Sequence, residues 1–131
     1  MFARFAAGST IASIAIALGA LVAVLTPGLT FERIYPLTII WCMAPLAWGV
    51  WALLAPAAWV PQRLPFWGAV LGLIAGLLAT YVLDLPSRVL GETLSVFGRT
   101  VVVLVLTVFY YILWMLVRVA CRSLTSAALG R

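Results

Sequence analysis

The chain has 131 residues, of which 66% are hydrophobic and only 8% are charged. Soluble domains contain roughly 45–50% apolar and about 25% charged residues, so this composition excludes a water-soluble fold. We therefore predict an all-α membrane protein whose outer surface is solvated by lipid. A chain of this length forms one small unit. We expect residues 1–131 to make a single polytopic membrane domain, without a linker or a soluble domain.

The formal net charge of +5 comes from eight arginines and three acids, with no histidine. A nucleic-acid interface needs a clustered basic face outside the membrane, and the connections between the apolar runs are too short to supply one. The two cysteines, Cys42 and Cys121, are too few and too far apart for a disulfide framework or a cysteine-ligated cluster. We expect no nucleic-acid partner, no metal site and no cofactor.

Four apolar runs are each long enough to cross a membrane as a helix, since a helix rises about 1.5 Å per residue and the hydrocarbon core is about 30 Å thick. They cover residues of about 5–25, 37–55, 66–83 and 100–117. The runs do not alternate as barrel strands do. A cleavable leader is the alternative for the first run, but the run is too long and no clean small-x-small site follows it. We predict a bundle of four transmembrane helices.

The second run contains Pro45 near its middle. A proline has no N–H to donate, so the carbonyl of Trp41 loses its helical partner and we predict a kink. Such a break lines a substrate site in some transporters. Proline bends are also ordinary in membrane helices, where neighbouring groups satisfy the freed carbonyl, and we favour this second interpretation.

The third run carries small residues at every fourth position, which places them on one face of a helix. Such a glycine zipper lets another backbone approach closely, which in lipid supplies van der Waals contact. We expect this face to pack against small residues at the same spacing in the first run, and a seam to a second subunit is the alternative. The residues are Gly68, Gly72, Gly76 and Thr80 in the third run, and Ala15, Gly19 and Ala23 in the first.

The segment between Pro86 and the fourth run has an amphipathic helical pattern. Arg88, Glu92, Ser95 and Arg99 follow one another at spacings of four, three and four, which predicts one polar stripe on an interfacial helix. The stripe is either the solvated end of the fourth helix or a candidate docking surface for a partner on that side of the membrane.

The arginines are divided unequally between the two ends of the predicted helices. With four spans, the N-terminus, the second connection and the C-terminal tail share one side, and the three acids fall on the other. The positive-inside rule then predicts that both termini are cytoplasmic. The use of Arg without Lys, together with abundant Ala and Gly, suggests a GC-rich genome and hence a bacterial inner membrane. The arginines on the termini side are Arg4, Arg63, Arg118, Arg122 and Arg131.

None of the four runs has an ionisable residue at its centre. Membrane catalysts and proton-coupled transporters usually keep such a residue despite its cost. We therefore expect no enzyme, and predict a non-enzymatic membrane subunit or an assembly and scaffold component of a larger membrane complex. The alternatives are a small oligomeric transporter or flippase for a hydrophobic or lipid-linked substrate, and a holin-like pore former. The expected partners are the lipid bilayer and either other membrane subunits or further copies of the chain.

Overall fold

The computed structural model describes residues 1–129, and that part of the chain is helical with no β-strand. Four helices are long and apolar enough to cross a membrane, which confirms the predicted all-α architecture and indicates an integral membrane protein. The long helices are α1 (Phe2–Leu25), α2 (Phe31–Leu54), α3 (Leu64–Leu77), which continues as the π-helix η2 (Leu78–Val82), and α5 (Val96–Leu129). The short elements are the 3-10 helix η1 (Ala57–Trp59) and α4 (Leu85–Leu90).

Two helices are longer than their apolar runs. Helix α2 includes Pro36 as well as Pro45, because membrane helices tolerate proline where other groups satisfy the freed carbonyl. Helix α5 continues to Leu129, well past the predicted end at 117. Its 34 residues span about 51 Å, which exceeds the hydrocarbon thickness. The apolar run predicted only the part of α5 that is needed to cross the hydrocarbon, whereas the helix also includes Arg118 and Arg122 beyond that run.

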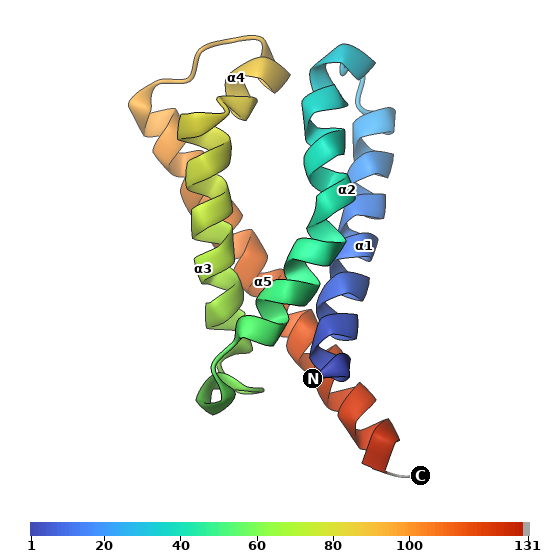
Figure 1. Cartoon of the computed structure of the whole chain (residues 1–131). Helices are drawn as coiled ribbons and strands as arrows, with labels where there is room; N and C mark the ends of the chain where they lie inside the picture. The colour runs from blue at the N-terminus through green and yellow to red at the C-terminus, as the bar shows by residue number, and fades with distance from the viewer. Residues whose placement is uncertain (130–131) are drawn as a thin grey trace.

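The long helices form two pairs, α1 with α2 and α3 with α5 (Figure 1). Within each pair the helices pack extensively, and the pairs meet where α1 contacts α5 and where α2 contacts α4. The N-terminus, η1 and the C-terminal part of α5 lie at one end, which we call the termini end. The α1–α2 turn and α4 lie at the opposite end, which we call the α4 end.

Aromatic rings fill the place where the two pairs meet. Trp114 of α5 is 0% exposed, and its ring centroid lies 5.7 Å from that of Trp48 in α2. The Trp48 ring is also 5.0 Å from the ring of Tyr110. Small buried residues from the first pair, Ala7 and Ala52, complete this core. Large aliphatic side chains elsewhere face outward on all four long helices, as expected for surfaces that contact lipid.

The predicted amphipathic helix over 86–99 is interrupted, since α4 covers its start and α5 its end, and the prediction of one continuous polar stripe was wrong. Helix α4 ends at Leu90, where Gly91 adopts a φ of +78° and so terminates the helix in the left-handed region. Irregular backbone follows until α5 begins at Val96. The helical spacing of polar residues is present in the sequence, but Gly91 ends the helix in the middle of the segment.

Candidate functional site

The glycine face of α3 is filled by side chains of α5. Gly68, Gly72 and Gly76 are all buried. A Cβ added at Gly68 would overlap the Trp114 ring, and one added at Gly72 would lie 2.6 Å from the Tyr110 Cβ. The glycines therefore form a recess that accepts large aromatic side chains from the neighbouring helix.

The prediction that this face packs against the first helix was wrong, because residues of α5 cover it. The nearest atom to a Cβ added at Gly19 belongs to Trp41 of α2, at 3.8 Å, so the predicted small-residue face of α1 looks toward α2. Small residues at a spacing of four show that a helix face is smooth but not which helix covers it. Ala15 is half-buried and Ala23 is buried on the same helix.

Thr80 continues the glycine face into η2 and is 0% exposed. Its Oγ1 has no hydrogen-bond partner among residues 1–129. A buried hydroxyl without a partner is costly, and π-helical turns occur often at functional sites. The Thr80 hydroxyl shares this lack of a partner with the indole N–H of Trp114, which is also buried.

A second close contact, between α1 and α2, was not predicted from the sequence. A Cβ added at Gly8 would lie 2.8 Å from the carbonyl oxygen of Trp48, and one added at Gly49 would lie 2.6 Å from the Phe5 ring. Gly8 and the buried Ala12 have the small-xxx-small spacing, so a signal was present at the start of the first run.

The same contact includes the predicted kink. Ser9 Oγ donates a hydrogen bond to the carbonyl of Pro45 at 2.9 Å. Helix α2 remains continuous across Pro45. Figure 1 shows α2 bending along its length, with the half that leads to η1 turned toward α3. The serine thus joins α1 to α2 beside the proline.

Two tryptophans connect α2 to α3 by a reciprocal pair of hydrogen bonds. The indole N–H of Trp51 donates to the carbonyl of Trp67 at 3.0 Å, and the indole N–H of Trp67 donates to the carbonyl of Trp51 at 2.9 Å. Their rings stack with centroids 4.7 Å apart, and Trp59 meets Trp67 edge-on. This arrangement holds the two helix pairs together near the termini end.

At the α4 end, Arg99 interacts with two residues of the same chain. Its guanidinium lies 3.1 Å from a carboxylate oxygen of Asp84 and 6.0 Å from the centroid of the Tyr81 ring. Asp84 precedes α4 with a left-handed φ of +48°, and its carboxylate accepts a hydrogen bond from Ser87. The ion pair thereby connects the start of α5 to the start of α4.

The other candidate docking residues do not join this cluster. Arg88 and Glu92 are exposed, and Ser95 Oγ accepts a hydrogen bond from the Gly98 N–H at the start of α5. The four residues of the predicted stripe therefore have three different surroundings. The structure does not bring them together as one surface.

Among residues 1–129, no group of three or more His, Cys, Asp or Glu side chains is placed to hold a metal ion. Comparison with protein families, with curated proteins and with solved structures found no match for this chain. The function proposed below therefore depends on the residues and geometry of this chain alone.

Proposed function

We propose that the chain is a non-enzymatic membrane subunit that serves as an assembly or scaffold component of a larger membrane complex. The observation that carries the proposal is the filled junction between the helix pairs, where Trp48, Tyr110 and Trp114 pack together and Gly68 receives the Trp114 ring. Close-packed interiors transmit strain and keep one arrangement. A closely packed junction favours a scaffold subunit, which keeps one arrangement, over a transporter or pore former, which must open a path through the membrane.

The outer surface supports the same proposal. Large aliphatic side chains are exposed along all four long helices, including Ile14 on α1 and Val108 on α5. In a membrane these faces contact either lipid or the helices of another protein. The small-residue faces are used within the chain, so contacts with other subunits would use these aliphatic surfaces.

For the location, we propose a bacterial inner membrane with both termini in the cytoplasm. At the termini end the structure describes Arg4, Arg63, Arg118 and Arg122, and Arg131 lies outside the described residues. The positive-inside rule places such an end in the cytoplasm. A fluorescent protein fused to the C-terminus should be active, and an alkaline phosphatase fused there should be inactive. The opposite result would reverse the orientation.

The subunit role is tested by photocrosslinking in native membranes. Photoreactive benzoylphenylalanine replaces Val108 in one strain and Ile14 in another, since both side chains are exposed. A subunit should give a crosslink to one defined membrane protein from at least one position, and that protein should copurify at a fixed ratio after mild extraction. Crosslinks only to further copies of the chain would instead favour the transporter or flippase. Depolarisation and growth arrest on expression would favour the pore former.

A further inference from the structure

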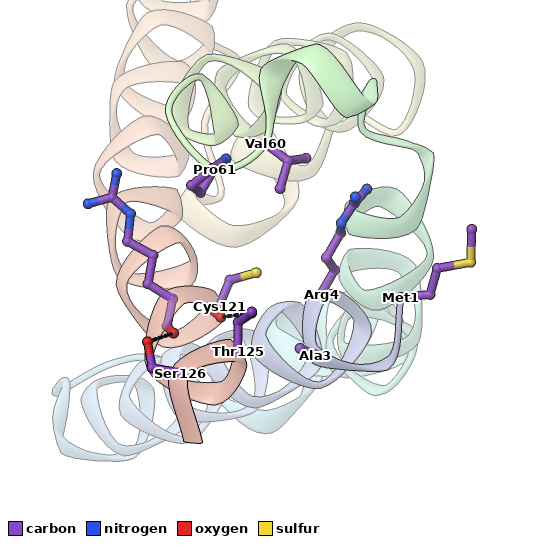
Figure 2. Close-up of a pocket in the computed structure, with 9 residues that line it drawn as sticks. Met1, Ala3, Arg4, Val60, Pro61, Cys121, Thr125 and Ser126 are labelled. Atoms are coloured by element: carbon purple, nitrogen blue, oxygen red, sulfur yellow. Dashed lines mark hydrogen bonds between the residues drawn. The ribbon is translucent and has the colours of Figure 1, made fainter. Parts of the chain in front are cut away.

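A cavity of about 510 Å³ lies at the termini end of the molecule. Three distant parts of the sequence line it: the start of α1, the connection between α2 and α3, and the C-terminal part of α5. Figure 2 shows Val60 and Arg4 at its sides, with the Cys121 thiol directed into the space between them. The cavity is of the size that small-ligand sites commonly have.

The charged side chains that line this cavity are all cationic. Arg4 and Arg122 belong to the lining, and no acid does. Arg4 makes one long hydrogen bond, 3.4 Å from Nη1 to the carbonyl of Ala55, so most of its donors remain free for a ligand. The Arg4 guanidinium is therefore available to an anion, and a planar guanidinium matches phosphate oxygens well.

Helix α5 carries another arginine, Arg118, near the cavity in sequence, although Arg118 is not one of the residues that line it. Arg118 precedes Cys121 and Arg122 by three and four residues, which places the three on one helix face. Its Nε is buried and has no hydrogen-bond partner within residues 1–129. Buried guanidinium donors without partners favour the uptake of an anion.

The acids of the chain cannot neutralise these arginines, because they lie at the other end. Glu32 begins α2 at the α1–α2 turn, Asp84 is paired with Arg99, and Glu92 follows α4. The two ends are separated by the length of the long helices (Figure 1). The anion must therefore come from outside the described chain.

The position of the cavity identifies the kind of anion. Trp59 and Trp67 lie at the same end, and tryptophan is enriched where a membrane helix meets the headgroup layer. The apolar side chains of Val60 and Pro61 form part of the wall beside the arginines. A ligand at this level needs an anionic head and an apolar body, which is the chemistry of an anionic phospholipid.

We propose that this cavity binds the headgroup of an anionic phospholipid, with Arg4 contacting the phosphate and the Val60–Pro61 wall contacting the glycerol region. The site goes beyond the proposed subunit role and does not depend on it. A lipid held here would bridge the start of α1, the α2–α3 connection and α5.

The test is native mass spectrometry of the purified chain in mild detergent, titrated with phosphatidylglycerol or phosphatidylcholine. We expect wild type to bind phosphatidylglycerol in preference. Replacing Arg4→Gln should weaken phosphatidylglycerol binding about fivefold, since each arginine near a charged lipid surface contributes about a fivefold preference. The control variant Arg88→Gln removes an exposed arginine at the α4 end and should leave binding unchanged.

A second measurement covers the case in which the Arg4→Gln variant fails to fold. In a Cys42→Ala chain with all arginines present, phosphatidylglycerol should slow the reaction of Cys121 with a small thiol reagent, and phosphatidylcholine should not. Equal binding of the two lipids, or unchanged Cys121 reactivity, would overturn the proposal. Complete displacement by glycerol 3-phosphate would show that the ligand is a soluble phosphate ester and would overturn the lipid assignment.

Discussion

The two helix pairs use glycine in different ways. In the α3–α5 pair, Gly68 and Gly72 form a recess that receives the side chains of Trp114 and Tyr110. In the α1–α2 pair, Gly8 lets the helix approach the main chain of Trp48. Lipid gives little hydrophobic drive between helices, so both pairs depend on contact area. At Gly68 a side chain must move to admit an added group, whereas at Gly8 the backbone must move.

The largest effect is expected at the recess. Replacing Gly68→Leu should lower the free energy of unfolding by about 3 kcal/mol, since overpacking of a filled site forces neighbours off their preferred positions. Titration with SDS in mixed micelles measures this. The control Val70→Leu lies on the outer face of α3 and should change little. In a double variant with Trp114→Ala, the Gly68→Leu substitution should cost less, and strictly additive effects would contradict the packing described here.

Replacing Gly8→Ala tests the backbone contact of the first pair. The new Cβ would lie 2.8 Å from a carbonyl oxygen, so we expect a loss of about 2 kcal/mol in the same SDS titration. Gly19→Ala in the same helix is the matched control, because its nearest neighbour lies 3.8 Å away. Alanine also favours the helix, so the control should be neutral or stabilising. Equal losses at both positions would show that the α1–α2 contact differs from this description.

A substitution at Thr80 tests whether its hydroxyl, beside the glycine recess, stabilises the α3–α5 pair. Thr80→Val keeps the shape and removes a buried hydroxyl without a partner, so stability should rise by about 1 kcal/mol. In the control Thr107→Val the lost hydroxyl donates to the carbonyl of Val103 at 2.8 Å, and no gain is expected. A loss at Thr80 would instead indicate that its hydroxyl has a partner in the membrane, such as a bound water or another subunit.

The connection between the two pairs is tested at Trp51. Trp51→Phe keeps a ring for stacking but removes one of the two reciprocal hydrogen bonds, and a bond of this kind in a membrane contributes about 0.6 kcal/mol. Trp59→Phe is the control, since it leaves both reciprocal bonds intact. A change in unfolding free energy for Trp59→Phe that equals the change for Trp51→Phe would assign the effect to ring size.

The smallest effect is expected at the α4 end of the α3–α5 pair. Asp84→Asn removes the ion pair with Arg99. The Arg99 side chain is 26% exposed and the Asp84 side chain is 41% exposed. Ion pairs this exposed contribute about 0.5 kcal/mol or less, and salt screens them. We expect a small loss that disappears at high ionic strength. A loss above that of Trp51→Phe would show that Asp84 also holds the left-handed turn before α4.

Much of the fold was predictable because lipid imposes strong rules on sequence. Runs of apolar residues without charge gave the four long helices, and the glycine spacing gave the smooth face of α3. The true ends of α2 and α5 were missed, because helices continue past the apolar run that hydropathy detects. The structure of segment 86–99 was predicted wrongly. Its polar residues have the spacing of a single helix, but Gly91 ends α4 within the segment.

Candidate site residues were harder to predict than helices. The cavity at the termini end joins residues from three parts of the chain, and nothing in the local sequence around Arg4 or Val60 links them to Arg122. The excess of arginine at that end was visible in the sequence. Which residues surround the cavity depended on how the helix pairs meet.

The amino-acid sequence alone determined that this chain is an integral membrane protein with four helices long and apolar enough to cross the bilayer, because burial of charge in hydrocarbon is costly and the four runs carry almost none. Tertiary structure decided which helices pair, because small residues permit close approach without specifying a partner. In the structure the glycine face of α3 contacts Trp114 and Tyr110 of α5 rather than the first helix. Which helix packs against which depends on the shapes of side chains that are far apart in the sequence, and no local sequence pattern predicts how these shapes fit together.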